Sequence, residues 1–264
     1  EVGLGGRLDA TNLVTPLVSV ITPLALEHTA VLGNTIQEIA VEKGGIIKEG
    51  VPVVTANQPP EALAVLQELA QQRNAPLTVA AERWQSVRTN ISLDGQTFNT
   101  RSNDFSRSGP AETGITRSRS GPAETTEVVT TSHCATYQDL RLSLLGKHQV
   151  ANATLVVAAL HLLREQGVTW DEAALREGLA QVVWPARVEV LQRNPLVIAD
   201  GAHTHASAAA LIHTINDLMP KGWSRSTLIL GISSNKDFAA LLDAFQPIAD
   251  TIILTRASHP RAAD

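Results

Sequence analysis

LVIADGAHTHASAAAL, residues 196–211, contains a complete strand, loop and helix signal in one short stretch. Its apolar run predicts a buried strand that ends at Asp200, and a Gly201-Ala202 turn follows. Thr204 is a favourable N-cap for the helix predicted by the alanines after it. GISSNKDF (231–238) repeats this order of strand end, loop and helix start. Repeated units of this kind are typical of an α/β fold.

The same alternation extends over most of the chain. Short β-branched runs predict strands at 17–22, 51–55, 77–81, 196–200, 226–231 and 251–255. Helical periodicity predicts helices near 34–44, 59–73, 148–166, 171–181, 205–218 and 237–246. Strands that alternate with helices favour parallel sheets, so we expect an α/β protein built on parallel sheets.

Two interruptions divide this pattern. Polar strand-like pieces between about 84 and 140 surround a low-complexity segment in which RSGPAET occurs at 107–113 and again at 119–125. Such a composition cannot bury enough surface to order itself, so we expect a disordered surface insertion at about 103–127. Pro185 ends the preceding helix and a new α/β run follows, which predicts domains at 1–184 and 185–264.

Composition excludes several classes of function. The chain has 264 residues, 44% of them hydrophobic and 18% charged, with a formal net charge of −5, so no basic surface for nucleic acid is expected. No apolar run reaches the roughly 18 residues of a membrane-spanning helix. We therefore expect a cytoplasmic monomer without a membrane segment. The single cysteine, Cys134, cannot form an internal disulfide and has no motif around it.

EVGLGGRLDATN, residues 1–12, combines glycines with charged side chains. It suggests a dinucleotide fingerprint, but Leu8 occupies the third glycine position of that motif, which argues against this interpretation; the alternative is that the glycines are simple turn residues. Glu1 and the segment Glu27-His28-Thr29 both belong to loops near a predicted strand end, where they would face one crevice. Mg²⁺ would take Glu1 readily and His28 less readily, and a surface or capping role for His28 remains the alternative.

Lys43 falls on the apolar stripe of its predicted helix, in register with Ile36 and Ile39. Burial lowers the pKa of a lysine, and a neutral amine can react with carbon dioxide to give a metal-binding carbamate. The alternative is that the stem packs while the ammonium reaches water. Glu38 and Glu42 lie on another face of this helix and are interpreted as solvated.

Three further groups of polar residues are candidates. Asp200 and His203 are expected at a strand end and a helix start, a place suited to hydroxyls and phosphate oxygens. Gln149 and Asn152 stand in the first turns of the helix predicted at 148–166, where amides either cap the helix or meet a purine edge. Asp237 is expected to be a helix cap.

Six segments together resemble the folylpolyglutamate synthase/dihydrofolate synthase family of the Mur ligase superfamily. They are EVGLGGRLDATN, LEHTAVLGNTIQEIAVEKGGIIK (26–48), GKHQVANA (146–153), PARVEV (185–190), ADGAH (199–203) and SHPRAAD (258–264). The resemblance implies a Mur-ligase-like central parallel-sheet ATPase domain and a Rossmann-like C-terminal ligase domain. It also implies an ATP-dependent amide ligase that uses Mg²⁺ and joins L-glutamate to folate or dihydropteroate through an acyl phosphate.

The same resemblance assigns roles to individual residues. It implies that Glu1 and His28 bind Mg²⁺, that Lys43 is carbamylated and serves a second metal, and that His203 acts beside the phosphates; Lys43 and His203 are thus the catalytic candidates. It implies a pterin-side pocket at Leu8, Asp9 and Ala10, and nucleotide contacts from Asn152, Arg187 and Asp200.

This chain departs from the family pattern in three respects. The family's phosphate-binding GTNGKGS loop is absent, so we expect the chain to be N-terminally truncated and inactive by itself. Thr204-His205 replaces the usual Asn-Pro after DGAH, and the C-terminal domain is expected to be incomplete. Two alternatives remain open: a Mur-type ligase that acts on another precursor, and a catalytically inactive α/β fragment or binding module.

Overall fold

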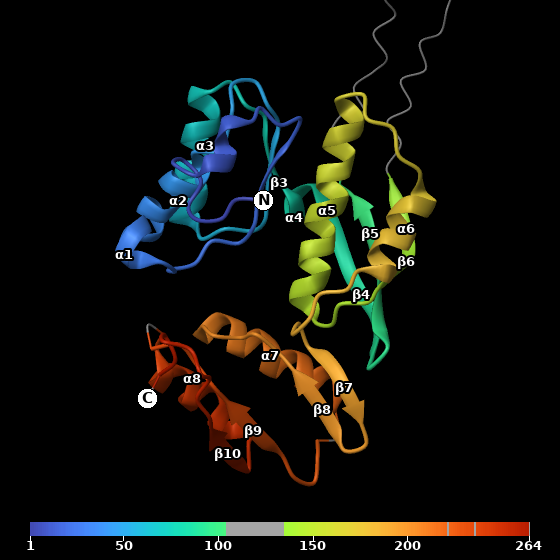
Figure 1. The fold of residues 1–264 in the computed structure, drawn as a ribbon. Coiled ribbons are helices and arrows are strands. Elements are labelled where there is room, and N and C mark those ends of the chain that lie inside the picture. The colour runs from blue at the N-terminus through green and yellow to red at the C-terminus, as the bar shows by residue number, and fades with distance from the viewer. Residues whose placement is uncertain (104–134, 221, 235, 264) are drawn as a thin grey trace, which may run out of the picture.

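The computed structural model describes residues 1–103, 135–220, 222–234 and 236–263. In this part of the chain helices and strands gather into three bodies, each with its own apolar core (Figure 1). No helix of the described residues has both the length and the apolar character needed to cross a membrane. The predicted insertion from residue 104 onward and Cys134 lie outside the described residues.

The N-terminal body is a parallel sheet with helices, as predicted. Its strands β1 (Ser19–Ile21), β2 (Val53–Thr55) and β3 (Leu77–Val79) pair in that order. Helix α2 (Ile36–Gly44) packs on α3 (Pro60–Gln72), and short α1 (Thr29–Leu32) precedes them. The core of this body includes Ile21, Val53 and Leu66, which are fully or almost fully buried.

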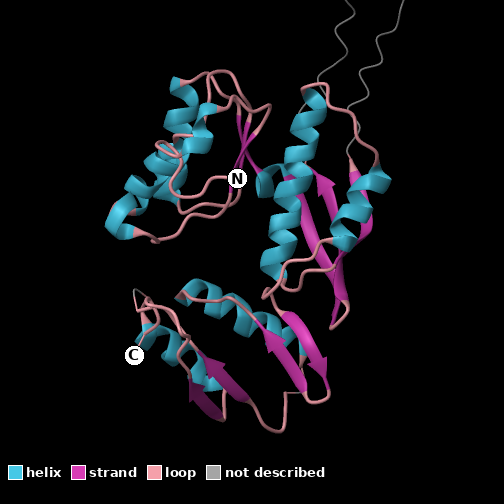
Figure 2. Cartoon of the chain, viewed as in Figure 1, coloured by secondary structure: helices cyan, strands magenta, loops and turns pink. Residues whose placement is uncertain are grey.

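The middle body departs from the expected parallel arrangement. Strands β4 (Trp84–Ser92), β5 (Gly95–Ser102) and β6 (Thr136–Leu142) form an antiparallel sheet. Short α4 (Ala80–Arg83) leads into β4, α5 (Lys147–Glu165) packs against β4, and α6 (Glu172–Gln181) packs against β6 (Figure 2). Strands with one face toward a helix and one toward water alternate apolar and polar residues, which explains why these segments look polar in sequence.

The C-terminal body contains two separate pairs of strands. β7 (Glu189–Arg193) and β8 (Leu196–Ala199) form an antiparallel hairpin, whereas β9 (Thr227–Leu230) and β10 (Thr251–Leu254) are parallel. Helices α7 (His205–Leu218) and α8 (Phe238–Phe245) cover them, and a short 3₁₀ turn, η2 (Gln246–Ile248), follows. The expectation of a buried parallel strand at 196–200 was wrong, because β8 is half-buried and pairs with the preceding strand, β7.

Each strand and helix predicted from the sequence overlaps an observed element of the same type, so the α/β fold class is confirmed. The elements without a specific prediction are the 3₁₀ turn η1 (Ala10–Leu13), α1, α4, η2 and strands β4–β7. The domain boundary at 185 stays a prediction.

Helix caps follow the sequence signals in part. Thr204 caps α7 by accepting a hydrogen bond from Ser207 N, and Asp237 caps α8 by accepting one from Ala240 N, as predicted. The interpretation of Glu38 and Glu42 as solvated is confirmed for Glu38, which is exposed, whereas Glu42 is half-buried. Glu38 also completes a capping box with Thr35 at the start of α2, and Glu42 forms an ion pair with Arg7 at 2.7 Å.

The N-terminal loop packs directly on the end of α2. Arg7 N donates to Glu42 O at 2.8 Å, and a Cβ on Gly45 would lie 2.4 Å from Arg7 Cβ and 2.5 Å from Arg7 Cα. A Cβ on Gly6 would likewise meet Glu42 O at 2.8 Å. These glycines therefore permit two stretches of backbone to touch, which supports the turn interpretation over a dinucleotide fingerprint.

Gly45→Ala should destabilise the N-terminal body by about 1–3 kcal/mol, because the new methyl group has backbone rather than a flexible side chain in its way. Gly178→Ala is the matched control, since nothing lies within 4 Å of its Cβ position in α6, and alanine should add about 0.5–1 kcal/mol there. Urea unfolding of both variants measures the difference. Equal stabilities would contradict the close approach of Gly45 to Arg7.

Candidate functional site

One cavity lies where the three bodies meet. It has a volume of about 740 Å³, and we call it the central cavity. The start of α5, the loop between β8 and α7, and the segment after β1 all line it. Four residues predicted to act together line this cavity: Asn152, Arg187, Asp200 and His203. Long-range folding thus brings these separate motifs to one place.

Asp200 is held by backbone hydrogen bonds on both of its carboxylate oxygens. Oδ2 accepts from Val188 N at 2.8 Å, and Oδ1 accepts from Ala202 N at 2.7 Å. These bonds tie the start of the β7–β8 hairpin to the loop that follows it. Each carboxylate oxygen keeps a lone pair that can accept a further hydrogen bond from a ligand.

His203 precedes the N-cap of α7 and is exposed. Its Nδ1 lies 2.9 Å from Gly201 O, and its backbone N donates to Ser207 Oγ at 3.1 Å. A carbonyl oxygen can only accept, so Nδ1 carries the hydrogen and the neutral ring presents an unprotonated Nε2. The imidazole can therefore accept a proton at Nε2.

Arg187 lies beside a glycine that leaves room for it. A Cβ on Gly201 would be 2.9 Å from Arg187 Nη1. Ala186 and Val188, on either side, both have positive φ angles, 54° and 49°, so this stretch turns sharply between α6 and β7. The turn is fastened by Gly201 N donating to Ala186 O at 2.9 Å.

The first turns of α5 supply the amide side of the central cavity. Asn152 Nδ2 donates to the Oε1 of buried Gln149 at 3.0 Å, and α5 has no side-chain cap. The capping interpretation of these two amides was therefore wrong. The bond between them leaves the oxygen of Asn152 and the nitrogen of Gln149 available for other partners.

Glu27, from the segment expected to face a crevice, lines the same cavity, and so does His148, which was not predicted as a site residue. Burial lowers the pKa of His148, the positive charge of Arg187 adds to that effect, and the Asp200 carboxylate opposes it. His148 is therefore largely neutral at pH 7. The sequence did offer a signal for His148. It precedes Gln149 in GKHQ, and neighbouring residues in the first turn of a helix lie at the same end of that helix.

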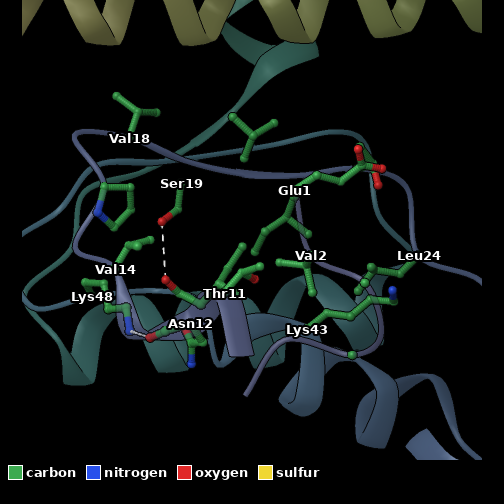
Figure 3. A pocket seen from close by; sticks show the side chains of 17 residues that line it. Glu1, Val2, Thr11, Asn12, Val14, Val18, Ser19, Leu24, Lys43 and Lys48 are labelled. Atoms are coloured by element: carbon green, nitrogen blue, oxygen red, sulfur yellow. Dashed lines mark hydrogen bonds between the residues drawn. The ribbon is translucent and has the colours of Figure 1, made fainter. Parts of the chain in front are cut away.

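A second cavity, the N-terminal cavity, has a volume of about 520 Å³ and is lined by Glu1, Lys43 and Lys48 among others (Figure 3). Lys48 Nζ donates to Asn12 O at 2.6 Å, whereas Lys43 is half-buried and its amine makes no hydrogen bond or ion pair within the described ranges. Val20 and Thr22 line both cavities, so the two adjoin at the end of β1.

The structure brings together only part of the expected metal set. Glu1 and Lys43 share the N-terminal cavity, but His28 is exposed, starts α1 with φ at 54°, and lines neither this cavity nor the central one. The described residues contain no group of three histidine, cysteine, aspartate or glutamate side chains placed to hold a metal ion. The donor set present therefore does not by itself fit Mg²⁺, and the metal roles stay predictions.

None of the expected pterin-side residues lines the N-terminal cavity, whereas the adjacent Thr11 and Asn12 do. Leu8 is 79% exposed. Asp9 organises the loop, because its carboxylate accepts from Gly3 N at 3.1 Å and from Leu4 N at 3.0 Å while capping η1 through Thr11. The roles of Leu8, Asp9 and Ala10 toward a ligand stay predictions.

Residues 186–264 match the family model for the glutamate ligase domain of Mur ligases. The dihydrofolate synthase/folylpolyglutamate synthase of Bacillus subtilis is 34% identical over 264 residues, which cover 100% of this chain and 54% of that relative. The chain is a homologue of the folylpolyglutamate and dihydrofolate synthases. It spans about half the length of the curated relatives it matches.

Solved structures of folylpolyglutamate synthases agree in fold. The Mycobacterium tuberculosis enzyme complexed with ADP superposes with a TM-score of 0.80 at 29% identity, covering 100% of this chain and 52% of its own. A folylpolyglutamate synthase complex with AMPPCP and folate gives a TM-score of 0.78 at 30% identity, covering 96% of this chain and 54% of its own. The similarity to this family and the Mur-ligase-like fold inferred from the six motifs are thereby confirmed.

Asp9 gives a pH-dependent test of the N-terminal loop. The Thr11 hydroxyl and the N–H groups of Leu4, Thr11 and Gly3 together lower the pKa of Asp9 from 3.8 to about 2. Because the pKa is lowered on folding, the stabilising effect of the carboxylate is complete above 3.8 and is lost as the pH falls through about 2. Amide exchange at Gly3 and Leu4 should follow that lower midpoint.

Asp9→Ala should remove the exchange protection of the Gly3 and Leu4 amides at every pH, because no acceptor remains for them. Asp171→Ala, at the N-cap of α6, is the matched control and should leave these amides unchanged. A wild-type midpoint near 3.8 would show that the carboxylate does not make these bonds.

Proposed function

We propose that this chain is part of an ATP-dependent amide ligase that joins L-glutamate to folate or dihydropteroate. The observation that carries the proposal is the meeting of GKHQVANA, PARVEV and ADGAH side chains in the central cavity. The relatives are named as folylpolyglutamate or dihydrofolate synthases, and their solved structures carry ADP, AMPPCP or folate. A cavity assembled from these same segments supports a nucleotide site here.

The chemistry of the central cavity suits the parts of ATP. The free amide groups of Asn152 and Gln149 can pair with a purine edge, which presents both donors and acceptors. The Asp200 carboxylate, fixed by two backbone N–H groups, can accept from ribose hydroxyls. The Arg187 guanidinium can pair with phosphate oxygens in a fork geometry.

The proposed reaction has two steps. A carboxylate oxygen of the folate-side substrate attacks the γ-phosphorus of ATP and ADP leaves, giving an acyl phosphate. The glutamate amine then attacks the acyl carbon and inorganic phosphate leaves. In this scheme His203 is the catalytic residue that takes the amine proton at Nε2, the nitrogen left free by the contact of Nδ1 with Gly201 O.

The N-terminal cavity is the proposed folate side. Leu8, Asp9 and Ala10 would border the pterin, and the cavity joins the central one at Val20 and Thr22. Mg²⁺ stays the proposed cation that would offset phosphate charge when bound, although Glu1 and His28, its expected ligands, do not line one cavity. Lys43, whose amine is unpaired among the described residues, is the proposed carbamylated lysine.

The remaining parts of the proposal concern the domain boundary, the oligomeric state, the location and the substrates. A boundary at residue 185 would separate the ATPase part from the ligase part, and the family match that starts at residue 186 supports it. We further propose a cytoplasmic monomer that uses ATP, L-glutamate and a folate as substrates. Steady-state phosphate release by a full-length version of the protein, measured with and without folate and with and without glutamate, tests the reaction. Release that needs neither would contradict the proposal.

Asn152→Ala should weaken AMPPCP binding about tenfold, because it removes one hydrogen-bonding group from the nucleotide side at roughly 1.4 kcal/mol. Alanine is a better helix former than asparagine, so folding should not suffer. Asn216→Ala is the matched control, since Asn216 is exposed on α7 and lines neither cavity. Isothermal titration with AMPPCP and Mg²⁺ measures both. Unchanged affinity in Asn152→Ala would remove this amide from the site.

A further inference from the structure

An ion pair joins α7 to the sheet of the middle body. Arg88 of β4 and Asp217 of α7 meet with Nη2 and Oδ2 2.5 Å apart. Their side chains are only 14% and 23% exposed, although the residues are 129 positions apart in sequence. The pair therefore crosses between two bodies rather than stabilising one of them.

The neighbouring turn of α7 lies against the start of α5. Gly146, the N-cap of α5, has φ at 107°, and a Cβ there would be 2.4 Å from Thr214 Oγ1. Thr214 is fully buried. Gln96 of β5 fixes the same loop by donating from Nε2 to Leu144 O at 2.6 Å and to Gly146 O at 2.9 Å. One turn of α7 thus contacts the point at which α5 begins.

These two helices both carry residues that line the central cavity. α5 presents His148, Gln149 and Asn152, while His203 and Thr204 precede α7 and Ser207 lies in its first turn. A helix of the length of α7 moves as a rigid rod. If its C-terminal end shifts at Asp217, its N-terminal end, which lines the cavity, shifts as well. The separation of the walls therefore depends on what holds the far end of α7.

The surroundings of Arg88 and Asp217 indicate that this ion pair fixes the orientation of α7 and adds little to the free energy of unfolding. Burial raises the pKa of Asp217, but the hydrogen bond and charge of Arg88, with the charges of His213 and Lys147, outweigh it, so the pKa is lowered overall. Arg88 Nη1 is buried without a hydrogen-bond partner in the described part of the chain. Buried ion pairs that are incompletely satisfied add little net stability, yet they penalise any arrangement that separates the charges.

We propose that Arg88 and Asp217 are positioning residues that set the spacing between the α5 and α7 walls of the central cavity. This inference rests on the proposed function for its effect on nucleotide binding, but the spacing itself can be measured without a ligand. A second tie between the same two bodies, Arg193 with Asp94 at 2.5 Å, has side chains 56% and 70% exposed. Solvent screens that pair, which makes it the natural control.

Nucleotide affinity gives the first test. Asp217→Asn and Arg88→Lys should each weaken AMPPCP binding about tenfold, and the exchanged pair Arg88→Asp with Asp217→Arg should recover most of the loss. Arg193→Ala should bind AMPPCP as the wild type does. A loss that the exchanged pair fails to reverse, or an equal loss in Arg193→Ala, would overturn the proposal. Circular dichroism confirms that each variant is folded.

A distance measurement without ligand gives the second test. Spin labels at Ala151→Cys on α5 and His205→Cys on α7, in a Cys134→Ser background, report the spacing by double electron–electron resonance. The distribution should be narrow with the native pair, broad in Asp217→Asn, and narrow again in the exchanged pair. An unchanged distribution in Asp217→Asn overturns the proposal. Failure of wild-type protein to bind AMPPCP would instead reject the proposed function, with the distance result standing separately.

Discussion

The carboxylate of Asp200 is the contact on which the candidate site depends. By accepting from Val188 N and Ala202 N it joins the chain before β7 to the chain after β8. Arg187 lies within the first of these segments and His203 follows the second, so one side chain fixes the backbone that carries both. Because each bond ends on a charged oxygen, it is stronger than a bond between neutral groups.

The site is assembled from bodies that have separate cores. The amides of α5 belong to the middle body, the Asp200 loop belongs to the C-terminal body, and Thr22 and Glu27 come from the N-terminal one. Surfaces between such bodies are smaller and more polar than a core, so their relative placement depends on a few specific contacts. Arg88 and Asp217 supply one of these contacts, and the packing of Gly146 against Thr214 supplies another.

The residues that line the two cavities were predicted from the sequence to different extents. The residues of the central cavity belonged to motifs whose grouping was predicted, and the structure groups them. The N-terminal cavity contains Glu1 and Lys43 but lacks His28, which the left-handed backbone at the start of α1 places elsewhere. Sequence patterns predict where a strand ends to within a few residues. The direction of a side chain beyond that end depends on the backbone conformation of the turn that follows.

The sequence by itself determined the α/β class, most helices and strands, the caps at Thr204 and Asp237, and the similarity to the synthase family, because periodicity, capping preference and motif order are read directly along the chain. Only the tertiary structure decided the antiparallel pairing of β4–β6 and β7–β8, the bond between Asn152 and Gln149, and the ion pair between Arg88 and Asp217. The strand pairings and the ion pair join residues according to how whole elements pack. The amide bond depends on which way two side chains turn, and no local pattern specifies any of these.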